Sequence, residues 1–427
     1  MSTTVLEGGL VVPLDGAGTN PGIMDLVVRD GRIESLGPSG AAPPAGAERV
    51  DCRGRVVMPG LVNAHLHPDL HLLRGMVEDL SLHQWESCER LQRSLVVLDG
   101  DDAEPLQRAA VRGALAECAL AGVTRVACYG VTRRIERIAA EEMATLGLSG
   151  WVTIRDAACP RMAEGEFPHM YRLHAEEVLY DEELRAAAAA HERGERLVMH
   201  VAETHERVAF ALDRFGTTPI RLLARYGLLS PRVLLSHAIH VDDEEIALIA
   251  AAGAPVLASP VAEAKLADGL APIAAMHARG VRIALGTDAA VCNNGCDVLL
   301  EARFLGLLQR LSYGPATLPA GTLLRFATVD GAAALDSAAS QGLSAGAPAD
   351  IAILDATAPH MLPLVHGAGE SNLLAGIVFS GSGRDVTDVM AGGRWIVRDR
   401  RLVALDEDEI GEALGQAAAE LIRRTGG

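Results

Sequence analysis

Lysine, aromatic residues and long apolar runs are all scarce in this sequence. Of the 38 lysine and arginine residues only Lys265 is a lysine, and aromatic residues make up 3% of the chain. No uninterrupted apolar stretch reaches the roughly 18 residues that a membrane-spanning helix needs, so we expect no membrane partner. The first residues, Met1–Thr4, lack the basic and apolar segments of a signal peptide.

The cysteines are few and scattered. Seven occur, and none forms a Cys-x-x-Cys pair with another. An odd number of unpatterned cysteines is typical of reduced thiols, which predicts a cytoplasmic protein.

The chain is acidic and has an ordinary globular composition. It contains 427 residues, carries a net charge of −18, and is 49% hydrophobic and 22% charged. Length and composition predict a globular enzyme of two or three domains. The acidity argues against a nucleic-acid partner and is compatible with a small-molecule substrate.

Strand patterns gather at both ends of the chain. Residues 1–57 contain short apolar runs with Asp30-Gly31 as a hairpin turn, and similar runs recur within residues 345–427. Neither piece can bury a good core alone, so we expect both to complete one small β-sandwich domain. The second piece ends in a helical pattern over Glu407–Arg424. The strands expected in the first piece are Thr4–Leu6, Leu10–Pro13, Met24–Arg29, Arg32–Leu36 and Glu48–Val50.

Residues 58–344 alternate short apolar strands with Ala-rich amphipathic helices. Repeated units of this kind predict an α/β fold, most simply a (β/α)₈ TIM-like barrel with helices outside a parallel sheet. The segment from Ala157 to His174 has no room for a helix and a clean strand, so we expect a distorted, shortened fourth unit. The expected strands are Val123–Tyr129, Gly150–Arg155, Arg196–Val201, Arg232–His237, Ala254–Ser259 and Val281–Gly286. The expected helices include Glu206–Tyr226, Asp242–Ala252, Ile273–Arg279 and Cys296–Leu311.

Histidines and an aspartate stand where strands of such a barrel end. His65 and His67 share one face of the first strand, so both can close on one metal ion. His200, His237 and Asp288 end three later apolar runs. Active residues of a barrel lie at the C-terminal ends of its strands, so we expect these side chains on one rim. Three histidines and an aspartate suit zinc and leave one position for water.

Four motifs carry a resemblance to a known family. They are Pro59–His67, His200–Thr204, Ser236–His240 and Leu285–Asp288. They resemble the amidohydrolase superfamily, and the closest branch is that of the methylthioadenosine/S-adenosylhomocysteine deaminases and the chlorotriazine hydrolases. The resemblance extends over nearly the whole chain, including the split β-domain.

The resemblance implies a cofactor and roles for individual residues. It implies one divalent metal ion per chain, usually zinc, with Fe²⁺ or another divalent metal also compatible, and a homodimer. Glu203 would be the acid/base, His237 would position or polarise the attacking water, and Asp288 would also accept the proton of that water. The implied metal ligands are His65, His67, His200 and Asp288.

Four residues are candidates for contact with the substrate. His174 stands about where the family keeps a substrate-binding histidine. Trp85 and Arg155 are candidate pocket residues, with core packing and a surface salt bridge as their alternative roles. Glu263 occupies a position where the family has an asparagine, and we expect it to pair with a cationic, guanidine-like or amino-heterocyclic substrate. The family's ribose-recognising glutamate after Trp85 has no clear counterpart, which argues against a nucleoside.

The activity expected from these residues is hydrolytic deamination of an amino-substituted heterocycle or a related small C–N substrate. Release of chloride or an alkylamine from a triazine-like ring is the alternative, but Glu203 favours amine release, because an amine must be protonated to leave. A binuclear cyclic-amide hydrolase would need a lysine on the fourth strand, whereas Lys265 follows the seventh. A catalytically silent binding or assembly protein on the same fold is the hypothesis from another class.

Overall fold

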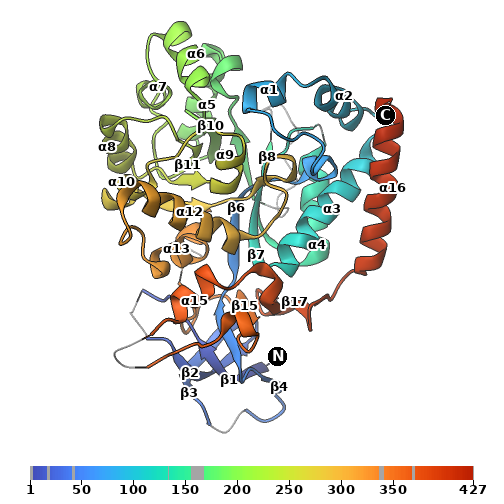
Figure 1. Ribbon diagram of the computed structural model, residues 1–427, viewed down its shortest axis with the longest axis vertical. Coiled ribbons are helices and arrows are strands. Elements are labelled where there is room, and N and C mark those ends of the chain that lie inside the picture. Colours follow the sequence, from blue (N-terminus) through green and yellow to red (C-terminus); the bar gives the residue numbers. More distant parts are fainter. Residues whose placement is uncertain are drawn as a thin grey trace.

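The computed structural model shows a barrel with a smaller β-rich part below it (Figure 1). The strands of the small part come from both ends of the chain, and the barrel lies between them in sequence. The described residues are 3–16, 20–40, 44–132, 134–154, 168–335, 341–367 and 371–426.

The barrel is a closed parallel sheet. Within the described residues its strand segments follow the order β13-β12-β11-β10-β9-β8-β7-β6-β14. The last barrel strand is split into β13 and β14, and β14 pairs with β6, which closes the ring. The segments are β6 (Leu61–His67), β7 (Val123–Cys128), β8 (Ser149–Ile154), β9 (His169–Arg172), β10 (Leu197–Val201), β11 (Val233–His237), β12 (Val256–Ala258), β13 (Ile283–Leu285) and β14 (Asp288–Ala289). This confirms the predicted α/β barrel.

The helices of the barrel lie outside its strands, and short capping motifs fix where several of them begin. The Asp242 side chain accepts from the Glu245 N–H at the start of α8, and Glu245 reaches back to the Asp242 N–H, a capping box. At the start of α6 the Thr204 side chain accepts from the Arg207 N–H, a simple N-cap. The helices of this part are η1 (Pro68–Leu73), α1 (Leu82–Glu86), α2 (Glu89–Leu98), α3 (Glu104–Leu120), α4 (Ile135–Leu146), η2 (Glu176–Val178), α5 (Asp181–Glu192), α6 (His205–Phe215), α7 (Pro219–Arg225), α8 (Asp243–Ala252), α9 (Pro260–Lys265), α10 (Ile273–Ala278), α11 (Ala290–Asn293), α12 (Val298–Tyr313), α13 (Ala320–Phe326) and α14 (Val329–Leu335).

The second sheet joins the two ends of the chain. Its order is β18-β17-β16-β15-β5-β1-β2-β3, with β4 paired to β1. It folds back on itself, because the Ile33 N–H of β3 donates to the Ala347 carbonyl, 2.9 Å away, just before β15. Its elements are β1 (Thr3–Val11), β2 (Gly22–Arg29), β3 (Arg32–Pro38), β4 (Glu48–Asp51), β5 (Arg55–Pro59), β15 (Ile351–Asp355), β16 (Val386–Ala391), β17 (Arg394–Arg398) and β18 (Arg401–Leu402), with η3 (Pro359–Met361), α15 (Leu373–Phe379) and η4 (Gly383–Asp385) between its later strands. The boundaries 1–57, 58–344 and 345–427 stay a prediction.

The last helix, α16 (Glu407–Thr425), returns from the small part to the barrel. It lies alongside α3 and α2 in Figure 1 and packs against both. Its buried side chains are Ile410, Ala417 and Leu421. None of the helices in the described ranges combines the length and the apolarity needed to cross a membrane.

Buried apolar side chains of the barrel strands leave only the strand ends to polar chemistry. Val62, Ala64, Val198, Leu234 and Ala284, from four strands, belong to one buried cluster. Such close-packed apolar side chains fill much of the barrel interior. The functional side chains therefore collect on the rim where the strands end.

Candidate active site

The two histidines of β6 are fully enclosed. Every residue of β6 is buried, and the rings of His65 and His67 stand edge to face with centroids 4.9 Å apart. The neighbouring strand approaches closely at Gly286, where a Cβ atom would lie 2.4 Å from the Cβ of His65. Only glycine permits this approach.

Three histidines and an aspartate converge at the strand ends. The His200 Nε2 lies 3.1 Å from the Nε2 of His65 and 3.3 Å from that of His67. The Asp288 Oδ1 lies 3.2 Å from the His67 Nε2 and 3.8 Å from the His65 Nε2. Tetrahedral ligands at the usual zinc–nitrogen distance lie roughly 3.3 Å apart, so this donor set fits one divalent metal ion.

The protonation of these histidines also suits a metal ion. Burial, together with the neighbouring histidines, lowers the pKa of His65 and His200 well below the ordinary value. Burial and the Arg172 charge lower the pKa of His67 to about 3. Neutral imidazoles with free Nε2 lone pairs are the form that binds metals.

The backbone around the cluster adopts conformations that side chains rarely allow. Ala202, His237, Ala238 and Asp288 all have positive φ, between 48° and 70°. Such strained residues cluster at functional sites, where the surrounding structure holds them in place. Here the sharp bends turn the residues that end β10, β11 and β13 toward a common point.

Asn63 ties together two of the three barrel strands that carry metal-binding candidates. Its Nδ2 donates to the Thr287 Oγ1 at 2.7 Å, and its Oδ1 accepts from the Thr287 N–H at 3.0 Å. Both contacts are buried. They fix the last barrel strand, just before Asp288, against β6.

Glu203 lies beside the cluster with its two oxygens in different environments. Its Oε1 lies 3.6 Å from the His237 Nε2, and its Oε2 is hydrogen-bonded to Arg207, one turn along α6. Arg207 also pairs with Glu86 at 2.9 Å and Glu177 at 3.1 Å. One carboxylate oxygen is thus anchored while the other faces the site.

Carboxylates surround His237. Burial alone would lower the pKa of His237, but Glu203, Glu263 and Asp288 together raise it to about 10. Burial in turn raises the pKa of Asp288 to about 6, although the His237 charge lowers it. A cation bound among the histidines and Asp288 would favour the ionised carboxylate and oppose the imidazolium.

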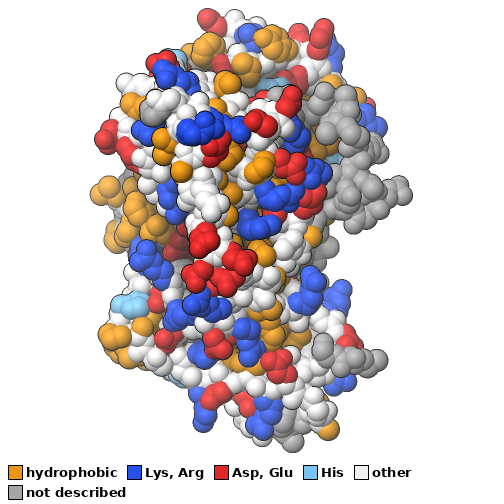
Figure 2. Space-filling model, turned by 90° about the vertical axis from the view of Figure 1, so that its right-hand side faces the viewer, with side chains coloured by type: hydrophobic (Ala, Val, Ile, Leu, Met, Phe, Trp, Pro, Cys, Tyr) orange, Lys and Arg blue, Asp and Glu red, His pale blue; other side chains and the backbone are white. Residues whose placement is uncertain are grey.

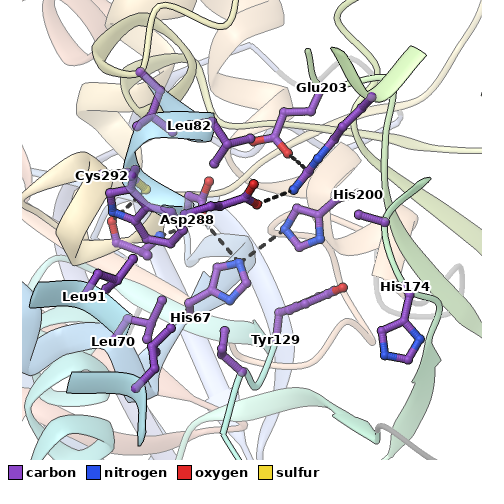
Figure 3. Close-up of a pocket in the computed structure, with 18 of the residues that line it drawn as sticks. His67, Leu70, Leu82, Leu91, Tyr129, His174, His200, Glu203, Asp288 and Cys292 are labelled. Carbon is purple, nitrogen blue, oxygen red and sulfur yellow. Dashed lines mark hydrogen bonds and ion pairs between the residues drawn. The ribbon is translucent and has the colours of Figure 1, made fainter. Parts of the chain in front are cut away.

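A cavity of about 280 Å³ opens onto this cluster. In Figure 3 leucines form one wall, His174 lies on the opposite side, and His67, His200, Glu203 and Asp288 lie between them. The apolar wall continues with Leu95, Val131 and Leu266. The cavity therefore combines an apolar surface with one reactive face.

Two of the four candidates for substrate contact line the cavity. Trp85 and His174 line the cavity, and the His174 Nδ1 lies 3.0 Å from Glu183. Glu263 is not among the lining residues, because its carboxylate is buried against His237 and the Ser259 N–H. Its placement therefore does not support the predicted contact with a substrate. Arg155 lies outside the described residues.

Three cavity residues have no counterpart in the sequence-based predictions. Tyr129 packs on the rings of His65, His67 and His200, with centroids 4.4 to 5.3 Å apart, and Arg172 lies over the Tyr129 ring. Tyr129 is the last residue of the predicted strand Val123–Tyr129, so the rule that strand ends carry function could have found it. For Arg207 the only signal in the sequence is its spacing of four residues from Glu203.

Comparison with known proteins identifies the family. The amidohydrolase family model matches residues 56–396. The chain belongs to the amidohydrolase family. This confirms the resemblance predicted from the four motifs.

Two curated relatives narrow the chemistry. A 5-methylthioadenosine/S-adenosylhomocysteine deaminase of Halobacterium salinarum is 34% identical over 452 residues, and the match covers 100% of each chain. A 5′-deoxyadenosine deaminase of Methanosarcina mazei is 30% identical over 444 residues, with 99% of each chain covered. The amidohydrolase described here is a hydrolase of carbon–nitrogen bonds other than peptide bonds, and its substrate is a small molecule.

Solved structures agree with the fold. An adenosine deaminase from Xanthomonas campestris with bound zinc has a TM-score of 0.88 and 25% identity, and 98% of each chain is covered. Atrazine chlorohydrolase from Arthrobacter aurescens, complexed with zinc, has a TM-score of 0.84 and 23% identity, with 97% of this chain and 100% of that chain covered. The second likeness concerns the fold alone.

Proposed function

We propose that this amidohydrolase is a mononuclear zinc-dependent aminohydrolase that replaces the amino group of a nitrogen heterocycle by oxygen. The observation that carries the proposal is the placement of Glu203. Its free oxygen faces the cluster of histidines and Asp288 at the base of the cavity. Deamination needs a proton donor at that place.

His65, His67, His200 and Asp288 would hold the metal ion, and its contribution would be to lower the pKa of water toward neutrality. Asp288 would accept a proton from the attacking water. Glu203 would deliver a proton to a ring nitrogen as the water attacks, take up the proton of the hydroxyl group formed on the ring carbon, and pass it to the amine as the carbon–nitrogen bond breaks. The proton held by Asp288 would then restore Glu203. His237 would orient the water through the ring nitrogen that faces Glu203.

The two candidate reactions, deamination and dechlorination, differ in whether the leaving group needs a proton. An amine is a poor leaving group until it is protonated, whereas chloride leaves as an anion without a proton. In a dechlorination Glu203 would protonate only the ring nitrogen, whereas a departing amine needs a second proton from the same carboxyl group. The two curated relatives are also named as deaminases.

Aminopurines and their nucleosides are the substrates to test first, although the sequence offers no clear counterpart of the family's ribose-recognising glutamate. The two curated relatives are named for adenosine derivatives altered at the 5′ position. The leucine wall of the cavity suits an apolar substituent at such a position, because burying an apolar group against it removes both surfaces from water.

An ammonia-release screen tests the proposal. Zinc-loaded protein is incubated with aminopurines, their nucleosides, pterins, aminotriazines and aminopyrimidines, and Glu203→Gln protein serves as the blank. The proposal predicts ammonia from at least one heterocycle and a loss of at least roughly 100-fold in the variant. Chloride or alkylamine release without ammonia would instead establish the alternative leaving group.

A further inference from the structure

The carboxylate of Glu263 is buried behind His237. Helix α9 begins directly after β12 with Ser259 and Pro260, and Glu263 lies one turn later. Its Oε1 accepts from the Ser259 N–H at 2.8 Å and lies 3.3 Å from the His237 Nδ1. The Glu263 residue is 3% exposed and His237 is 0% exposed, so neither contact is shared with bulk solvent.

This contact decides which ring nitrogen of His237 faces the site. The Glu263 Oε1 already acts as an acceptor toward Ser259, so the hydrogen between Oε1 and Nδ1 belongs to the imidazole. The opposite nitrogen, Nε2, has no hydrogen-bond partner among the described residues. It lies 3.6 Å from the Glu203 Oε1 and 3.9 Å from the Asp288 Oδ2.

The backbone alone does not fix the ring. His237 has φ of 70° and Ala238 of 48°, and the Ala238 N–H donates to the Val201 carbonyl at 3.0 Å. This bend sets where the side chain leaves β11. It leaves free the rotation of the ring about the Cβ–Cγ bond, which exchanges Nδ1 with Cδ2 and Nε2 with Cε1. The Glu263 contact removes that freedom.

We propose that Glu263 is a positioning residue, which keeps the proton of His237 on Nδ1 and turns Nε2 toward the space between Glu203 and Asp288. Its effect on turnover rests on the proposed function, whereas its effect on the imidazole does not. The competing account is that Glu263 only caps α9 through Ser259. The two accounts differ in whether the effect of Glu263 passes through His237.

A double-mutant cycle separates the two accounts. Glu263→Leu removes the acceptor, and we expect kcat to fall by roughly 10- to 100-fold with KM changed by less than about threefold, as for other residues that orient a ligand. Glu263→Gln keeps an acceptor and should lose less. In a His237→Asn background, Glu263→Leu should cost almost nothing further, because residues that act as a unit are not additive.

A matched control comes from Glu245. It is 2% exposed and accepts from the Asp242 N–H at the start of α8, as Glu263 accepts from the Ser259 N–H at α9, but it has no hydrogen bond or ion pair with a histidine among the described residues. Glu245→Gln should change kcat by less than about twofold. If Glu263→Leu cost the same with and without the His237→Asn substitution, the proposal would be overturned in favour of a capping role.

Nitrogen NMR of histidine-labelled, zinc-loaded protein shows directly which ring nitrogen of His237 carries the proton. The signals of His237 are those lost in His237→Asn. The proposal predicts a protonated Nδ1 in the unaltered protein and in Glu263→Gln, and a change of that signal in Glu263→Leu. An unprotonated Nδ1, or the same signal in all three, would contradict it. If no substrate were turned over, the proposed function would fail while this spectrum still decided the role of Glu263.

Discussion

Glu176 is a buried carboxylate next to the loop that carries Glu203. Its Oε1 accepts from the Ala202 N–H at 2.7 Å, while its Oε2 has no partner among the described residues. Burial raises its pKa from 4.5 to about 7, against the lowering effect of the Ala202 N–H and the Arg207 charge. The folded protein therefore binds this proton more tightly than the unfolded chain does.

A prediction on pH and stability follows from Glu176. The contribution of Glu176 to the free energy of unfolding is fully present below about pH 4.5. It is lost as the pH rises through 7, which lowers the free energy of unfolding by up to about 3 kcal/mol. Glu176→Gln should remove this loss. We therefore expect the variant to gain stability relative to the unaltered protein between pH 5 and pH 8.5, measured by denaturant unfolding. Parallel stability curves for the two proteins would contradict the assignment.

Arg207 is the second residue whose role the structure reveals. Its guanidinium holds Glu203 and also pairs with Glu86 and Glu177. Arg207→Gln should lower kcat/KM by roughly 10- to 100-fold, because Glu203 loses its anchor and two carboxylates lose their cation. Arg214→Gln, on the more exposed part of α6, is the control and should have little effect. Unchanged turnover in Arg207→Gln would show that Glu203 needs no anchor.

At the scale of the element, α16 links the end of the chain to the barrel next to η1, α2 and α3. Leu421 is fully buried there, whereas its neighbour Ile422 is 40% exposed. Leu421→Ala should lower the free energy of unfolding by about 2 to 4 kcal/mol, because it leaves a cavity. Ile422→Ala should cost less than about 1 kcal/mol. Equal effects of the two variants, measured by urea unfolding, would show that α16 contributes no packed core.

The long periodic elements could be predicted from the sequence, and the irregular ones could not. The pattern at Cys296–Leu311 predicted α12, and the apolar runs before His200 and His237 predicted β10 and β11. The predicted helix Glu206–Tyr226 is wrong in one respect: it is divided into α6 and α7, because Gly216 takes a positive φ and Pro219 begins a new helix. Strand β9 was missed, because its four residues carry no apolar run.

The small β-rich part also contains an irregularity that could not be predicted from the sequence. Two strands were predicted over Thr4–Leu6 and Leu10–Pro13, but one strand, β1, includes the first and the beginning of the second, with a register shift between Leu6 and Gly9. A bulge of this kind keeps a strand continuous where the alternation of side chains is interrupted. Sequence alternation alone cannot distinguish it from a turn.

The site shows why strand ends are easier to predict than helix side chains. The structure brings His65, His67, His200, His237 and Asp288 together, because the ends of parallel barrel strands meet on one rim. The positions of Glu263 and Arg207 depend on how α9 and α6 pack against the barrel. That packing is not encoded in local spacing, so Glu263 was expected at the substrate and lies behind His237.

At the scale of the whole molecule, charge is spread over the surface. Figure 2 shows acidic and basic side chains interspersed on the face that it presents, although the net charge is −18. On this face the two signs of charge therefore largely offset each other locally. The homodimer and the cytoplasmic location stay predictions, and sedimentation of the purified protein tests the first.

Removal of the metal ion should affect the whole molecule. A chelator should abolish turnover and lower Tm, because a ligand that binds only the folded state stabilises it, by about 4 kcal/mol at a free concentration 1,000 times Kd. Added zinc should restore both. In His200→Ala the chelator should not lower Tm and added zinc should not raise it. His240→Ala should respond to both like the unaltered protein. A chelator without effect on Tm or turnover would contradict the metal site.

Oxygen-isotope transfer tests the central claim most directly. The best substrate of the ammonia screen is turned over in water enriched in oxygen-18, with the product followed by mass spectrometry and ammonia by titration. The account predicts one labelled oxygen in each product molecule and one ammonia for each turnover, both absent with Glu203→Gln. A product without labelled oxygen, or ammonia release that Glu203→Gln leaves intact, would contradict hydrolytic deamination at this site.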